Sequence, residues 1–296
     1  MVNIKKKKIG NQEYYYLEHS FRVDGKTKKI EKYLGKEIPK NIEKLKQDIL
    51  FGLYKEKWFK LIYNIKKNYQ KEEEKRPLSA KEKEIELFTT KFTYNSQRIE
   101  GSKLTLRDTA NLLERGITPT EKPVRDIKEA ELHKKVFYSM LDYKKDLSLQ
   151  IVLYWHKTLF ESTKQDLAGK IRSHQVAISG SKFMPPIPAE LQALLNGFFD
   201  WYNQNKGKIN AAELAALVHL KFVTIHPFSD GNGRISRLMM NFVLHKKGLP
   251  MLDIPYEKRN SYYTSLERSQ VKNNDYIFLH WFFKKYLKEY RKLIKF

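Results

Sequence analysis

The chain has 296 residues, a formal net charge of +23 and no cysteine, and 41% of its residues are hydrophobic. The lack of cysteine excludes disulfide bonds, thiolate metal sites and a cysteine nucleophile. Its length suits one large globular domain, or a main domain with an appendage. Residues 1–9 are rich in lysine and precede no apolar stretch, and no apolar run reaches the roughly 18 residues of a membrane span. We therefore expect a cytoplasmic protein without a membrane partner.

The first 38 residues alternate short strand-like runs with turn dipeptides. Strands are expected at residues 5–8, 13–17, 21–23 and 28–34. Gly10-Asn11 and Asp24-Gly25 are typical of tight hairpin turns. The sequence therefore predicts a small β meander, whose basic and aromatic side chains suit either a binding surface for nucleic acid or protein, or packing on helices.

From residue 39 onward, apolar residues recur at helical spacing, so the fold class is mainly α. A long helix is expected over residues 41–75, and Ser79 is expected to open the next helix in a capping box with Glu82. Further helices are expected at residues 105–115, 124–144, 149–161, 189–206, 211–225, 235–247, 257–270 and 276–295. His156 lies on an apolar helical face and is expected in the core.

The segment from His226 to Arg237 joins two of these helices. Pro227 ends the first helix, and the second starts from a glycine-bearing turn. The free amides and the positive dipole end of such a helix N-terminus bind anions, and glycines let a ligand approach the backbone. Arg234 and Arg237 lie away from the apolar stripe of the second helix, where we expect them to reach outward and bind phosphate oxygens.

Two further residues of this segment can take part in chemistry on a polyphosphate. Asp230 can hold a magnesium ion, and His226 is the nearby group that can take a proton from a hydroxyl near neutral pH. Together these residues predict phosphoryl-type transfer. Two alternatives stay open: His226 as a packing residue at a helix end, and His226 with Asp230 as two ligands of a transition metal, which Pro227 disfavours because it interrupts the helix.

The same segment resembles the signature of the Fic family, H-x-F-x-[DE]-G-N-[GK]-R-x-x-R, at every fixed position. The resemblance implies a multi-helix core that transfers a nucleotide monophosphate, usually AMP from ATP, to a hydroxyl of a target protein. It implies that His226 is the general base, Asp230 the Mg²⁺ ligand and Phe228 a core anchor. The phosphate contacts that it implies are an anion hole for the α- and β-phosphates at Gly231, Asn232 and Gly233, the β-phosphate on Arg234 and the γ-phosphate on Arg237.

Glycine at position 233 bears on the type of reaction. The branch of the family that acts as a phosphotransferase carries lysine there, so the resemblance favours nucleotidyl transfer. A segment 40 to 55 residues upstream also resembles the family's flap, at Gly169, Arg172, Val176, Ile178, Gly180, Phe183, Pro185 and Pro186. Val176 and Ile178 alternate before a turn, which predicts a short β-hairpin whose edge can bind an extended target segment. An ordinary surface hairpin is the alternative.

Residues 96–101 are similar to the family's inhibitory motif, [ST]-x-x-x-E-[GN], and lie before the core. Gly101 is expected to follow a helix C-terminus, which places Glu100 where the helix dipole disfavours a carboxylate. We therefore expect Glu100, with Ser96 in the same motif, to occupy Arg237 and to block productive ATP binding. Asn260 and Tyr263 follow the core as the family's adenine-contacting region does.

The resemblance divides the chain into a β-rich appendage over residues 1–38, a helical lead-in over 39–104 that includes the inhibitory motif, and a Fic catalytic domain over 105–296. The expected function is transfer of AMP from ATP to a target protein, with Mg²⁺ as cofactor and inhibition by Glu100. The alternatives are AMP removal by the same site, and a basic nucleic-acid or protein-binding regulator with a vestigial site. A protein target is favoured over nucleic acid, because the basic residues spread over both ends of the chain; a homodimer stays open.

Overall fold

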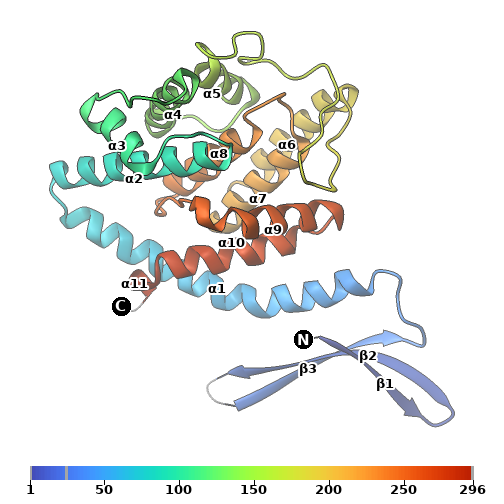
Figure 1. Ribbon diagram of the computed structural model, residues 1–296. Coiled ribbons are helices and arrows are strands. Elements are labelled where there is room, and N and C mark those ends of the chain that lie inside the picture. The colour runs from blue at the N-terminus through green and yellow to red at the C-terminus, as the bar shows by residue number, and fades with distance from the viewer. Residues whose placement is uncertain (1, 24–25, 295–296) are drawn as a thin grey trace. The chain divides into compact units, whose positions relative to one another are not determined.

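The computed structural model describes residues 2–23 and 26–294. The chain forms two compact units, Met1–Lys60 and Leu61–Phe296. Figure 1 shows the β-strands at the N-terminal end of the chain and the helices that follow. Within the described residues, no helix combines the length and the apolar character that crossing a membrane would require.

The first unit contains an antiparallel sheet in the order β1-β2-β3, formed by β1 (Asn3–Ile9), β2 (Gln12–Val23) and β3 (Lys26–Gly35). The turn at Gly10 is confirmed, with a φ of 61°. The separate strands predicted at 13–17 and 21–23 are wrong: they belong to one strand, because His19 and Ser20 continue the pairing with β3. The predicted turn at Asp24-Gly25 lies outside the described residues.

The other elements are helical, and the prediction of a mainly α fold is confirmed. They are α1 (Ile42–Lys75), α2 (Leu78–Ile99), α3 (Leu106–Arg115), α4 (Val124–Asp142), α5 (Leu149–Phe160), η1 (Pro188–Glu190), α6 (Leu191–Asn205), α7 (Ala211–Ile225), α8 (Asn232–Lys246), η2 (Tyr256–Lys258), α9 (Arg259–Val271), α10 (Asp275–Glu289) and α11 (Arg291–Ile294). The predicted helices match these elements, with boundaries that differ by a few residues, except at the C-terminal end. The single helix predicted at 276–295 is wrong, because α10 ends at Glu289 and α11 follows as a separate helix.

The capping box predicted for α2 is wrong. The carbonyl of Pro77 accepts from the amides of Ala80 and Lys81, both at 3.1 Å, so α2 begins at Leu78. Ser79 therefore lies inside the first turn and cannot act as the N-cap. A capping box forms at α3 instead, between Thr105 and Asp108.

Helix α8 lies in the core of the second unit, where it packs against α2, α4, α5 and α7. Every residue from Arg234 to Leu244 is buried. The prediction that Arg234 and Arg237 reach outward is therefore wrong. The face that carries them is covered by α2 and α4, whose acidic side chains compensate the buried charges, as the site shows.

Candidate active site

His226 ends α7 in an unusual backbone conformation. Its φ of 52° and ψ of 55° lie in the left-handed region, which costs a residue with a side chain roughly 1–2 kcal/mol. The backbone is held on both sides: the amide of His226 donates to the carbonyl of Phe222 at 3.1 Å, and its carbonyl accepts from Nε of Arg172 at 2.9 Å. The chain is thereby fixed where it turns toward α8.

The His226 imidazole is oriented through Nδ1, which lies 3.2 Å from the carbonyl oxygen of Val223. Because a carbonyl oxygen only accepts, Nδ1 carries the proton and Nε2 keeps a free lone pair. Burial lowers the pKa of His226 below its ordinary value of 6.5. The ring is therefore neutral near pH 7, in the form that can accept a proton from a hydroxyl.

An aromatic pair, Phe228 and His156, supports the loop that follows His226. Phe228 is buried, as predicted, and stacks on His156 with ring centroids 3.7 Å apart. Nδ1 of His156 accepts from the amide of Gly169 at 2.9 Å, so Nε2 carries the proton and donates to the carbonyl of Asp230 at 3.0 Å. Burial lowers the pKa of His156 to about 4. The buried position predicted for His156 is confirmed, and the neutral ring also connects the loop to Gly169 at the start of the flap.

Asn232 also braces the loop. Its side chain accepts from the amide of Phe228 at 2.9 Å and donates to the carbonyl of the same residue at 2.7 Å. The first amides of α8, at Asn232, Gly233 and Arg234, precede the first backbone bond of the helix, which Ile235 donates to the carbonyl of Gly231 at 2.9 Å. Asn232 can therefore contribute a backbone amide to an anion site, while its side chain is engaged in the loop.

Two glycines leave no room for a side chain. Gly231 has a φ of 82°, and a Cβ atom there would lie 2.5 Å from Cε2 of Phe160. A Cβ at Gly233 would lie 2.3 Å from Oε1 of Glu100 and 3.0 Å from Nη1 of Arg237. The carboxylate of Glu100 therefore closes directly onto the N-terminus of α8.

The C-terminus of α2 is closed by a Schellman-type cap. The amide of Gly101 donates to the carbonyl of Arg98 and the amide of Ser102 to that of Gln97, both at 3.1 Å. Gly101 has a φ of 98°. The predicted C-terminal position of Gly101 is confirmed, and the cap fixes Glu100 at the end of the helix.

Arg237 and Glu100 form the predicted pair, with Nη2 and Oε1 2.7 Å apart. Ser96 holds the same guanidinium: its hydroxyl accepts from Nε and its carbonyl from Nη2, both at 3.0 Å. Burial opposes the charge of Arg237, but Glu100 and Tyr262 together outweigh it, so the pKa of Arg237 lies above its ordinary value. The side chain of Arg237 is 1% exposed and that of Glu100 26% exposed, so the acid is the accessible partner.

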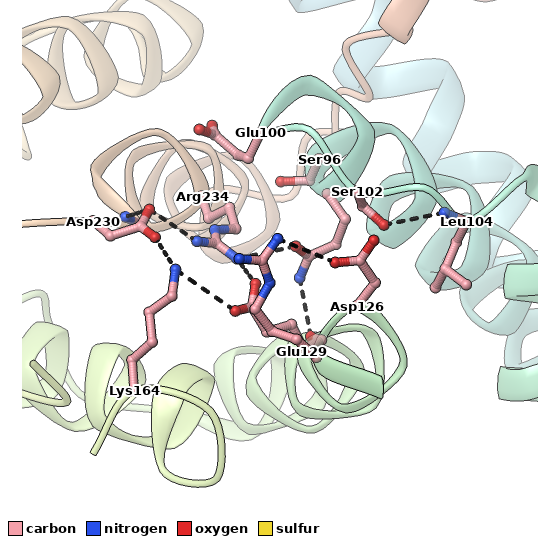
Figure 2. Close-up of polar contacts among 12 residues, drawn as sticks. Ser96, Glu100, Ser102, Leu104, Asp126, Glu129, Lys164, Asp230 and Arg234 are labelled. Atoms are coloured by element: carbon pink, nitrogen blue, oxygen red, sulfur yellow. Dashed lines mark hydrogen bonds and ion pairs between the residues drawn. The ribbon is translucent and has the colours of Figure 1, made fainter. Parts of the chain in front are cut away.

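Arg234 belongs to a second buried cluster, shown in Figure 2. Nη1 donates to Oε1 of Gln97 at 3.0 Å and to Oε2 of Glu129, and Nη2 donates to Oδ1 of Asp230 at 3.0 Å. The ammonium of Lys164 pairs with Oδ2 of Asp230 and lies 3.8 Å from Oε1 of Glu129. Two cations and two carboxylates therefore alternate around a closed ring.

A cavity of about 510 Å³ brings the predicted segments together. Its lining includes Glu100, Ile178, His226, Gly233, Arg237, Tyr262 and Tyr263. The hydroxyl of Tyr263 donates to the carbonyl of Ile99 at 3.0 Å. Asn260 is exposed, and neither it nor Val176 lies in the lining. The structure thus brings the inhibitory motif, the loop, the flap residues 178–181 and one adenine candidate to one cavity.

The flap reverses direction around Gly180, whose φ is 74°. The amide of Ser181 donates to the carbonyl of Ile178 at 3.0 Å. Side chains join the two arms in place of a β-ladder, with Nε2 of Gln175 donating to the carbonyl of Pro185 at 3.0 Å. Residues 169–187, all of them described, contain no strand. The predicted β-hairpin is therefore wrong: the chain reverses here, but its two arms form no backbone ladder.

The surroundings of Asp230 suit a metal ligand. Burial opposes the charged form, but Arg234 and Lys164 outweigh it, so the pKa of Asp230 lies below 3.8. A carboxylate that stays ionised, next to a helix N-terminus with free amides, suits Mg²⁺, which takes one or two carboxylates and completes its shell with phosphate oxygens and water. No cluster of three His, Cys, Asp or Glu side chains forms a metal site in the described part of the chain, so those oxygens would have to come from the substrate.

Comparisons with known proteins agree with this geometry. The model of the Fic/DOC family matches residues 146–244. A solved Fic domain containing signaling protein from Bacteroides thetaiotaomicron is 30% identical, with a TM-score of 0.69 over 78% of this chain and 96% of that one. The chain belongs to the Fic family.

Other members of the Fic family resemble parts of the chain. The protein adenylyltransferase Fic of Drosophila yakuba is 35% identical over 178 residues, which are 59% of this chain and 36% of that relative. The chain thus matches about a third of the length of this curated relative. Fic-1 from C. elegans has a TM-score of 0.72 at 24% identity over 86% of this chain and 77% of that one, which shows the Fic fold.

Four residues of the Fic site were not predicted as site residues: Gln97, Glu129, Lys164 and Tyr262. The hydroxyl of Tyr262 lies 3.5 Å from Nη1 of Arg237 and 2.8 Å from Nε2 of His219. Gln97 falls inside the inhibitory motif at an unspecified position, which was the only signal for it. The other three lie on segments that only the fold brings to α8.

Proposed function

We propose that this chain is a protein adenylyltransferase, which transfers AMP from ATP to a Ser, Thr or Tyr hydroxyl of a target protein. One observation carries the proposal: a neutral imidazole, that of His226, lines the same cavity as the N-terminus of α8 and the Arg237 guanidinium. A proton acceptor beside an anion site is what attack by a hydroxyl on a phosphate ester needs. The curated relatives named protein adenylyltransferase Fic support the same activity.

In the proposed reaction, the α- and β-phosphates bind at Gly231, Asn232 and Gly233, and Arg237 binds the γ-phosphate. Nε2 of His226 accepts the proton of the target hydroxyl. The hydroxyl oxygen forms a bond to the α-phosphorus, and the bond from that phosphorus to the bridging oxygen breaks. AMP remains on the target, and pyrophosphate leaves with the electron pair of the broken bond.

Mg²⁺ is the proposed cofactor, with Asp230 as its protein ligand. The ion would neutralise charge on the departing pyrophosphate. Arg234 donates to Asp230 at 3.0 Å, so its proposed contact with the β-phosphate would lie directly beside the metal. Ile178, on the flap, lines the same cavity as His226 and Arg237, and we propose that Val176 and Ile178 help to bind the target segment. Tyr263 is the better supported of the two adenine candidates, because Asn260 lies outside the lining.

Glu100 is proposed to hold the enzyme inactive. Its carboxylate takes the guanidinium that the γ-phosphate needs, and it lies against Gly233 in the proposed phosphate site. Because the arginine is buried, loss of the carboxylate leaves a charge that a triphosphate can compensate. ATP would therefore bind in a productive pose once Glu100 is removed.

Radiolabelled ATP tests the proposal. Glu100→Gly should raise self-labelling on the order of 100-fold, which corresponds to roughly 3 kcal/mol for freeing a buried charge. Adding His226→Ala should lower this labelling by roughly 10²- to 10⁴-fold, because the base is lost. The matched control is Glu131→Gly, at an exposed position of α4, which should label like the wild type. The mechanism would be rejected if Glu100→Gly left the labelling unchanged, or if adding His226→Ala did not lower it.

AMP removal is a second candidate, because Glu100 and His226 line one cavity and could both contact a water. Mixing the labelled product with wild-type protein distinguishes the two: release of AMP supports removal, and a stable label rejects it. The binding regulator with a vestigial site, the homodimer and the cytoplasmic location are predicted from the sequence alone.

A further inference from the structure

Both oxygens of Asp230, the proposed metal ligand, are engaged by cations of the protein itself. Oδ1 accepts from Arg234 at 3.0 Å and also from the amide of Gly231. Oδ2 is paired with the ammonium of Lys164, as the dashed lines in Figure 2 show. Mg²⁺ binds carboxylates by direct contact with an oxygen, and it repels a neighbouring ammonium. A metal ion at Asp230 must therefore compete with the Lys164 ammonium for the carboxylate.

Lys164 has a second carboxylate within reach. Oε1 of Glu129 lies 3.8 Å from the Lys164 ammonium, and it has no hydrogen bond to any of the described residues. Glu129 is 5% exposed, and a buried carboxylate oxygen without a donor is costly. Movement of the ammonium from Asp230 to Glu129 would supply that donor.

We propose that Lys164 and Mg²⁺ compete for Asp230, and that metal binding moves the Lys164 ammonium onto Glu129. The inference rests on the proposed function, because the metal arrives with ATP. In the nucleotide-free protein, Lys164 completes the charge ring and, together with Arg234, compensates the charge of Asp230. Its side chain is 23% exposed, so it can move without opening the core. Lys164 thus lowers the metal affinity of the site.

The test measures metal binding by electron paramagnetic resonance, with Mn²⁺ as the probe and saturating AMP-PNP. All proteins carry Glu100→Gly, so that Arg237 is free for the nucleotide. Lys164→Gln should bind Mn²⁺ about tenfold more tightly, whereas Lys164→Arg, which keeps the charge, should bind it as the parent does. Lys170→Gln removes the same charge at an exposed position, and should leave the dissociation constant unchanged.

The outcomes separate this inference from the proposed function. Nucleotide binding with the same Mn²⁺ constant for Lys164→Gln and its parent would overturn the competition alone. An equal gain for Lys170→Gln would also overturn it, because the effect would then be one of net charge. A protein that binds no nucleotide in any variant would overturn both. Lys164→Met provides a second neutral variant, and its constant should agree with that of Lys164→Gln.

Discussion

At the scale of single residues, the site depends on a glycine against which a neighbouring aromatic side chain packs closely. Gly231 combines a positive φ with an aromatic ring at 2.5 Å from its missing Cβ. That ring belongs to Phe160, which also contacts the Arg234 guanidinium, 4.6 Å from its centroid. A side chain at Gly231 would therefore displace the ring on which the loop and the arginine both pack.

Gly231→Ala should lower the free energy of unfolding by about 2–4 kcal/mol, from backbone strain together with overpacking. Gly116→Ala is the matched control, because Gly116 has a φ of 70° and nothing within 4 Å of a built Cβ. It should lose only about 1 kcal/mol. Urea denaturation measures both values. Equal losses would mean that the contact with Phe160 does not restrict this position.

At the scale of elements, α2 provides side-chain contacts to both arginines of α8. Ser96 and Glu100 hold Arg237, and Gln97 holds Arg234. The same helix contacts α4 through a buried hydrogen bond of 2.9 Å between Oγ1 of Thr93 and Nδ1 of His133. The helix proposed to inhibit the enzyme is therefore anchored in the core.

The bond between α2 and α4 predicts a stability that depends on pH. Burial, with Arg234 and Arg237 nearby, lowers the pKa of His133 from 6.5 to about 3. Below pH 6.5, His133 binds a proton in the unfolded chain but stays neutral in the folded protein. The free energy of unfolding therefore falls as the pH falls. At pH 5, His133 lowers the free energy of unfolding by about 2 kcal/mol, whereas well above pH 6.5 it has no effect on it.

His133→Leu removes the titrating group. The loss of unfolding free energy between pH 7.5 and pH 5, measured in urea, should therefore shrink by about 2 kcal/mol relative to the wild type. His174→Leu, at an exposed position, is the control and should keep the wild-type difference. A His133→Leu protein with an unchanged pH dependence would show that His133 is protonated in the fold.

At the scale of the whole molecule, the chain carries a net charge of +23, and part of the basic charge on the sheet is paired with acidic side chains. Several lysines there pair across strands, as Lys7 does with Glu31 at 2.5 Å and Lys29 with Glu18 at 2.7 Å. Nucleic acid as a partner stays a prediction that these pairs do not strengthen. All the proposed catalytic and inhibitory residues lie in the unit Leu61–Phe296.

Nucleotide binding should therefore stabilise this unit. In Glu100→Gly protein, AMP-PNP with Mg²⁺ at 100 times the dissociation constant should add about 2.7 kcal/mol and raise the thermal midpoint by about 5–10 °C. The wild type should shift less at the same concentration, because Glu100 competes for Arg237. Differential scanning calorimetry measures the shift. Equal shifts would mean that the carboxylate does not oppose nucleotide binding.

The sequence alone determined what depends on near neighbours: most helices, the turn at Gly10, the cap at Gly101, and the string of groups from His226 to Arg237. Each depends on backbone chemistry within a few residues. The division at residues 38 and 104 stays a prediction. The tertiary structure alone decided which partners the arginines have. Arg234 contacts Glu129 and Gln97, which are 105 and 137 residues away in sequence, and Lys164 contacts Asp230, which is 66 residues away. A buried charge requires a compensating partner, but only the packing of the helices decides which distant side chain supplies it.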